Sequence, residues 1–151
     1  MQTKDLYQRI KQAVVNTIKA MNLPLIGANV FSQYDCDTLN SGYPKITCIT
    51  AGLTEQVLPG DSLHREYEWP VGVMIEDDPG AKVHLLESQY TSIRKQITDT
   101  FHQANPCAAQ GVPEAHGSMV EPRVIFDPRL TQYGAVRSSL LIRVGCREPR
   151  Y

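Results

Sequence analysis

Two segments of the chain alternate apolar and polar residues, and this alternation restricts the possible folds more than any other feature. In residues 65–76 the apolar positions are Tyr67, Trp69, Val71, Val73 and Ile75. In residues 135–147 one face carries Val136, Ser138, Leu140, Ile142, Val144 and Cys146, and the other carries Arg137, Ser139, Leu141, Arg143 and Arg147. A period of two places successive side chains on opposite faces of a strand. Both segments are therefore predicted to be strands with one face on the core.

Two other segments have the period of an amphipathic helix. Over residues 4–21 the apolar stripe is Leu6, Ile10, Ala13, Val14, Thr17, Ile18 and Met21. Over residues 82–103 it is Val83, Leu86, Tyr90, Ile93, Ile97 and Phe101. Thr3 or Asp5 is suited to cap the first helix, and the sequence does not choose between them. We expect both helices to bury these stripes against the same sheet.

Shorter segments complete the predicted order of elements. The β-branched run 45–50 favours a strand, and short strands are expected at 30–31 and 124–126. Residues 51–64 and 104–123 contain turn residues and isolated apolar side chains, with three prolines and two glycines in the second stretch. Both stretches are predicted to be loops that act as contact arms rather than as core.

The order of these elements predicts an α+β fold. Strands follow one another without crossover helices, so the sheet should be mainly antiparallel with the two amphipathic helices packed on one face. Pro70 lies inside the first alternating strand, which suggests an edge position or a bulge, and Asp77-Asp78-Pro79-Gly80 should turn the chain after it. The length of 151 residues favours a single domain spanning 1–151.

Composition disfavours several classes of function. The formal net charge is −1 and the pI is about 6.4, whereas proteins that recognise specific DNA sequences usually have a basic excess. No apolar run approaches the roughly 18 residues that a membrane span needs. The first residues lack the pattern of a signal peptide, so a cytoplasmic origin is expected.

No group of residues suggests catalysis, a cofactor or a metal. Zinc sites usually have closely paired ligands, whereas the histidines and cysteines of this chain are scattered: His64, His84, His102, His116, Cys36, Cys48, Cys107 and Cys146. We expect the cysteines to be reduced and mostly buried thiols. Asp77-Asp78 is explained by its turn. Nucleophile-elbow and phosphate-loop motifs do not occur. We therefore expect no enzyme and no cofactor.

Charged residues are segregated between the two long strands. One face of the first carries Glu66, Glu68 and Glu76, and one face of the second carries Arg137, Arg143 and Arg147. A solvated sheet face with cross-strand pairs explains this pattern. A charge-complementary interface between identical subunits explains it equally well, and the two explanations can hold together. These six residues are the candidate subunit interface.

The order and lengths of the elements resemble those of the tail-terminator and neck (tail completion) proteins of tailed bacteriophages. The resemblance covers most of the chain and rests on the layout of elements rather than on an invariant motif. It is carried by the first amphipathic helix, the long second helix, and the segments Tyr43-Pro44-Lys45-Ile46-Thr47, Glu66–Glu76, Asp77-Asp78-Pro79-Gly80 and Leu140-Leu141-Ile142-Arg143-Val144. The stretch 104–123 is longer than in the smallest members.

The resemblance implies a structural virion protein without catalysis or cofactor. In that family a homo-oligomer, typically a hexameric ring, sits at the head-proximal end of the tail. The ring ends polymerisation of the tail tube and joins the tail to the head. Its partners would be the tail tube, a sheath where one exists, and the head-side connector. DNA would pass through the lumen without sequence-specific binding, and assembly would take place in the host cytoplasm.

Two alternatives remain open. One is a neck protein one layer nearer the head. The other, of a different class, is a small ligand-binding α+β domain or an enzyme. That alternative requires polar groups that converge in a pocket, and the sequence offers no such cluster.

Overall fold

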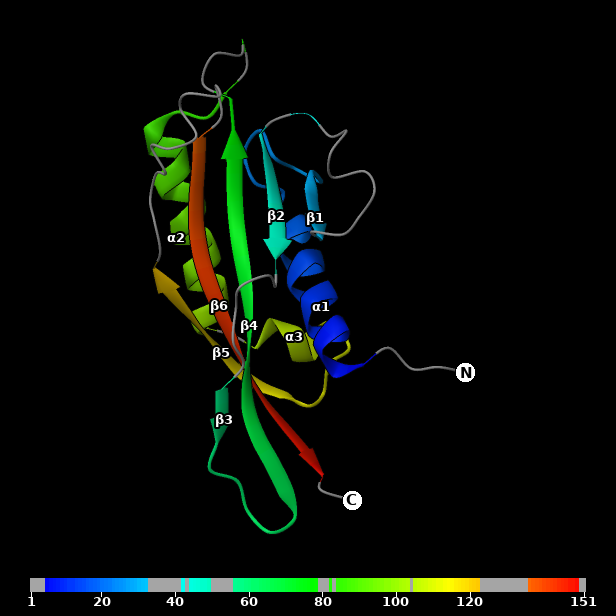
Figure 1. The fold of residues 1–151 in the computed structure, drawn as a ribbon. Helices are drawn as coiled ribbons and strands as arrows, with labels where there is room; N and C mark the ends of the chain where they lie inside the picture. The colour runs from blue at the N-terminus through cyan, green and yellow to red at the C-terminus, as the bar shows by residue number, and fades with distance from the viewer. Residues whose placement is uncertain are drawn as a thin grey trace.

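The computed structural model describes residues 5–32, 42, 44–49, 56–78, 82, 84–103, 105–122 and 136–149. Its helices are α1 (Leu6–Ala20), α2 (Glu87–Gln103) and α3 (Pro106–Ala109). Its strands are β1 (Val30–Ser32), β2 (Lys45–Ile49), β3 (Gln56–Leu58), β4 (His64–Asp77), β5 (Ala115–Pro122) and β6 (Val136–Pro149). Figure 1 shows the two long strands β4 and β6 side by side along the length of the molecule.

The strands form one sheet in the order β1-β2-β4-β6-β5, and β3 pairs with β4 beyond the end of β2. Each pair is antiparallel except β1 with β2. The prediction of a mainly antiparallel α+β fold is confirmed. The centre of the sheet is the β4–β6 pair, in register from His64 opposite Pro149 to Asp77 opposite Val136.

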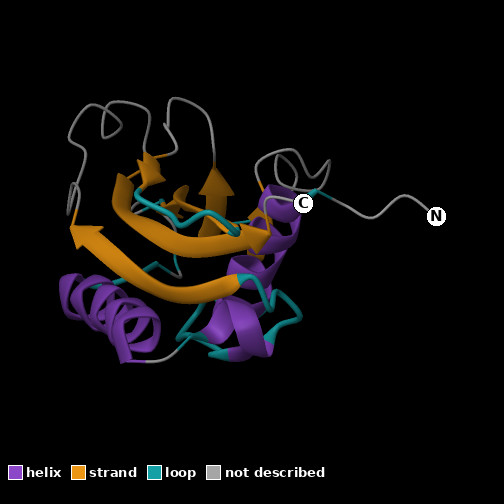
Figure 2. Ribbon diagram, turned by 90° about the horizontal axis from the view of Figure 1, so that it is seen from below, coloured by secondary structure: helices purple, strands orange, loops and turns teal. Residues whose placement is uncertain are grey.

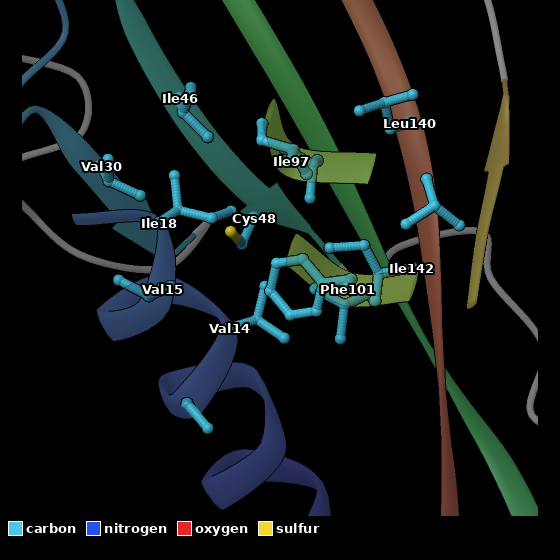
Figure 3. Packing of buried hydrophobic residues seen from close by; sticks show 14 of the residues in the cluster. Val14, Val15, Ile18, Val30, Ile46, Cys48, Ile97, Phe101, Leu140 and Ile142 are labelled. Atoms are coloured by element: carbon cyan, nitrogen blue, oxygen red, sulfur yellow. The ribbon is translucent and has the colours of Figure 1, made fainter. Parts of the chain in front are cut away.

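Helices α1 and α2 pack on the same face of the sheet, as Figure 2 shows from one end. The alternation in the two long strands selects this face, because Val71, Val73 and Ile75 of β4 are buried together with the even-numbered residues 138–146 of β6. Figure 3 shows side chains of α1, α2, β2 and β6 pointing toward one another in this core. Asp5 caps α1, since its carboxylate accepts the Gln8 amide at 2.9 Å.

Pro70 lies in the middle of the sheet rather than on an edge strand. It is tolerated there because β2 pairs with residues 72–76 of β4 and β3 pairs with residues 66–68, which leaves an interval between them. The Tyr7 hydroxyl of α1 donates to the Pro70 carbonyl at 2.8 Å in this interval. The missing N–H of proline therefore breaks no strand pairing.

The prediction that Leu86 belongs to the buried stripe of the second helix is wrong. Helix α2 begins at Glu87, and Leu86 is 58% exposed, whereas Leu85 is buried. The Leu85 amide donates to the carboxylate of Asp77 at 2.5 Å, which holds the chain in a non-helical conformation just before α2. Tyr90, Ile93, Ile97 and Phe101 of the predicted stripe are buried. Val83 lies outside the described residues.

The prediction of a loop and contact arm at 104–123 is also wrong. This stretch contains α3 and β5, and its buried side chains Cys107, Val112, Ala115 and Val120 belong to the core. Its prolines occupy positions that regular structure accepts, with Pro106 in the first turn of α3 and Pro122 at the end of an edge strand. A register shift between Ala115 and Gly117 interrupts the alternation that would have marked a strand. The strand predicted at 124–126 lies outside the described residues.

The described part of the other predicted arm, 51–64, is the start of a hairpin. Residues 56–58 form β3, which pairs with β4, and residues 59–63 connect the two strands. Leu141, which the alternation placed on the outer face of β6, is buried. Part of the sheet face opposite the helices is therefore covered as well.

Candidate assembly surface

The six charged residues of the candidate interface lie on adjacent strands of one sheet. In the β4–β6 register Glu66 is opposite Arg147, Glu76 is opposite Arg137, and Glu68 is opposite Gly145. Two of the three acidic positions of β4 therefore face a basic position of β6 within a single chain, whereas Glu68 does not. The strand register brings together residues that are far apart in the sequence. It is the arrangement that a sheet face with cross-strand charge pairs requires.

Two of the arginines form ion pairs within the chain. Arg147 lies 2.7 Å from the Asp61 carboxylate and 3.6 Å from that of Glu66. Arg143 lies 2.7 Å from Glu121 of β5. The Arg147 pairs are well exposed to solvent, so we expect each to contribute little to stability. Their geometric effect is to hold the β3–β4 connection against β6.

The β3–β4 hairpin carries the most exposed apolar side chains of the described residues. Val57 is 81% exposed and Leu63 is 62% exposed. Figure 1 shows that this hairpin reaches past the lower end of α1. Because β4 and β6 each have 14 residues, the ribbon spans roughly 45 Å at about 3.3 Å per residue. Exposed apolar side chains gathered on one projecting element are typical of a contact with another protein.

Asp61 organises the connection of this hairpin. Its carboxylate accepts the backbone amides of Leu63 at 2.8 Å and His64 at 2.7 Å, and it also contacts the His64 ring and Arg147. These hydrogen bonds, with that from Leu63 the largest cause, lower the pKa of Asp61 to about 2. An ionised Asp61 therefore stabilises the conformation of the hairpin at neutral pH.

We expect the Asp61 carboxyl to titrate near pH 2 in the folded protein, below its usual 3.8. Because the folded pKa is the lower one, the contribution of Asp61 to stability is complete above about pH 4 and is lost as the pH falls toward 2. NMR titration of the Asp61 side chain measures this value. Arg147→Gln should raise the pKa only in part, since the Leu63 amide remains. A midpoint at 3.8 in the parent protein would contradict the described geometry.

Strand β5 is an edge of the sheet, and helix α2 closes part of that edge. The Val120 amide donates to Nε2 of His102 at 2.7 Å, and the Ser118 hydroxyl donates to the Phe101 carbonyl at 2.5 Å. Pro122 has no N–H to offer. Blocking the free amides of an edge strand prevents it from pairing with other chains. From the sequence alone His102 is one of several scattered histidines. The packing of α2 on β5 reveals its hydrogen bond with the Val120 amide.

Three of the four cysteines lie in the described part of the chain. Cys48, Cys107 and Cys146 are free and buried, as predicted, and burial raises the pKa of each thiol to about 12. Cys36 lies outside the described part of the chain. No group of three His, Cys, Asp or Glu side chains is arranged to hold a metal within the described ranges. None of the described helices is long and apolar enough to cross a membrane.

Comparison of the chain with known protein families and with curated proteins gives no match to either.

Proposed function

We propose that this chain is a structural subunit of a tailed-phage virion, assembling as a ring at the head-proximal end of the tail. The ring would end polymerisation of the tail tube and join the tail to the head-side connector, with DNA passing through its lumen. The proposal includes no catalytic activity and no cofactor. It rests on the resemblance in element order and on the projecting hairpin, and the exposed Val57 and Leu63 are the observation that carries it.

The blocked edge strand β5 and the exposed apolar hairpin both favour a closed assembly over open growth of the sheet. Strand β5 is blocked as a pairing edge by His102 and Pro122, so open growth by strand addition is disfavoured there. The apolar hairpin lies at a different place in the fold, where β3 pairs with the first half of β4. A patch of this kind that meets a different surface of the next subunit gives a ring when the rotation closes.

We expect the purified protein to have a mass near six times the 16.9 kDa of one chain. Changing both Val57 and Leu63 to Asp should dissociate this assembly, because two charges would then be buried at the contact. Light scattering after size-exclusion chromatography measures the mass. Leu86→Asp is the matched control, since Leu86 is 58% exposed but lies before α2, away from the hairpin. A parent protein that is monomeric at all concentrations would refute the ring.

Changes to the charged residues of β4 and β6 provide a second test of the same assembly. Reversal of Arg143 and Arg147 to Glu removes pairs that already exist within one subunit. Because Arg147 also holds the β3–β4 connection that carries Val57 and Leu63, the apolar-hairpin contact predicts a ring that survives reversal of Arg143 alone, at low and high salt, and that weakens only when Arg147 is reversed as well. Dissociation at low salt together with full resistance to the Val57 and Leu63 changes would instead identify the charged strands as the interface.

One observation favours the alternative of a small ligand-binding domain. A pocket of about 550 Å³ lies beside the base of the hairpin, and polar and aromatic side chains converge in it. This volume is within the range of small-molecule sites. A monomer in the mass measurement, combined with a ligand that copurifies, would favour that alternative over the ring.

A further inference from the structure

Strand β5 has a row of backbone groups that faces away from β6. The Val120 amide belongs to this row, because it donates to Nε2 of His102 on α2 at 2.7 Å. The backbone groups of successive residues in an antiparallel strand alternate in direction, so Ser118 and Pro122 lie in the same row. Pro122 has no N–H. The hydrogen bond to His102 therefore protects the N–H in the middle of this edge from pairing with another strand.

This hydrogen bond requires a neutral His102 ring. A neutral imidazole has one nitrogen that accepts a hydrogen bond and one that carries a proton, whereas both nitrogens of the protonated ring are donors. Because Nε2 accepts the Val120 amide, the proton of the neutral ring is on Nδ1. Protonation of Nε2 would place an N–H against the Val120 N–H and drive the two groups apart. The protection of the edge thus depends on the charge of one side chain.

The position of His102 lets its ring exchange protons with the solvent. The residue is exposed, and it lies in the last turn of α2. The C-terminal end of a helix favours a positive charge, because its free carbonyl groups carry partial negative charge. Histidine side chains change their charge between about pH 5 and 8. Mild acidification therefore reaches this ring without unfolding the protein.

The charged side chains that neighbour this contact are paired with one another. Asp99, one turn before His102 on α2, lies 3.0 Å from Lys95. On β5 the neighbouring carboxylate is that of Glu121, which lies 2.7 Å from Arg143 of β6. Both carboxylates already have a cation, so they offer little compensation to a protonated His102. The charge of the ring therefore acts chiefly on its contact with β5.

We propose that His102 is a pH-sensitive switch at the edge of the sheet. With a neutral ring the Val120 amide is held by α2, and β5 cannot use this amide to pair with another strand. With a protonated ring the amide is released, and the edge gains a free donor. The proposal does not rest on the ring assembly, since it needs only the contact between α2 and β5 of one chain.

NMR titration and amide exchange of the whole chain test this switch. The Val120 amide proton and the His102 ring signals should shift with a common midpoint between pH 8 and 5. Val73 lies between β2 and β6 and serves as the internal reference. The exchange protection of Val120, divided by that of Val73, should fall roughly fivefold over this range, the effect of losing one hydrogen bond. A constant ratio, or midpoints that differ, would overturn the proposal.

Three variants assign the response to His102. His102→Gln keeps an oxygen that can accept the amide but does not titrate, so the ratio should stay high at both pH values. His102→Ala should give the low ratio at both. His116→Gln is the matched control, because His116 is on β5 itself and its ring lies over Gly145. It should keep the response of the parent. A His102→Gln protein that still loses protection in acid, or a His116→Gln protein that no longer does, would assign the response to another group and refute the switch.

Discussion

Replacing Ile97 with alanine should lower the free energy of unfolding by about 2–5 kcal/mol. Ile97 is fully buried on the face of α2 that packs against the sheet. Figure 3 shows it together with Phe101 of the same helix and Ile142 of β6. Truncation would remove apolar burial and leave a cavity that close-packed neighbours fill only in part. Ile93, also fully buried, should behave in the same way.

Chemical denaturation followed by circular dichroism measures this loss. Leu86→Ala is the matched control, since Leu86 lies just before the same helix but is 58% exposed. We expect it to change stability by less than about 0.5 kcal/mol. If Ile97→Ala cost under about 1 kcal/mol, or if Leu86→Ala cost as much, the helix would be packed on the sheet by a different stripe.

Replacing Asp77 with alanine should cost about 1–3 kcal/mol, because it would leave buried polar groups without partners. Asp77 is 1% exposed at the end of β4. Its carboxylate accepts the amides of Asp78 at 2.8 Å and Leu85 at 2.5 Å. It also lies close to the Tyr90 hydroxyl, whose pKa is raised by burial first and by Asp77 second. One side chain thus connects the end of β4 to the start of α2.

Asp77→Asn separates the loss of hydrogen bonding from the loss of charge. Asparagine keeps one oxygen that can accept an amide, so it should be less destabilising than alanine. The neighbouring Asp78→Ala serves as control, since Asp78 is only partly buried. Equal stability of the Asp77→Ala protein and its parent, in urea unfolding at neutral pH, would show that the Leu85 amide finds another acceptor.

The elements that the sequence predicted well are those whose periodicity continues without interruption. Strands β4 and β6 and helix α1 alternate or repeat over many positions, and burial of one face follows directly from that repeat. Strand β5 was missed because its shift at Gly117 breaks the alternation. Leu86 was misplaced because helical spacing continued, by coincidence, into residues that the Asp77 contact holds out of the helix. Local patterns cannot reveal a contact of this kind.

The candidate site was harder to predict for the same reason. Glu66 and Arg147 were both singled out from their own strands, but the sequence does not state which strands are neighbours. The structure pairs them within one chain. The pocket combines Tyr7, Trp69 and Glu148, which come from three distant segments. No spacing rule brings such residues together, so no cluster could be nominated from the sequence alone.

The position of β6 in the sheet has a consequence for how the chain folds during synthesis. Strand β6 lies between β4 and β5, and among the strands that the structure describes it is the one with which β5 pairs. A ribosome would finish β4 and β5 well before residues 136–149 emerge. Until then the apolar face of β4 lacks one neighbouring strand, and β5 lacks its described partner. Pairing between segments so far apart in sequence is slow and leaves strand edges open to other chains. We therefore expect the nascent chain to stay vulnerable to aggregation until β6 has been made.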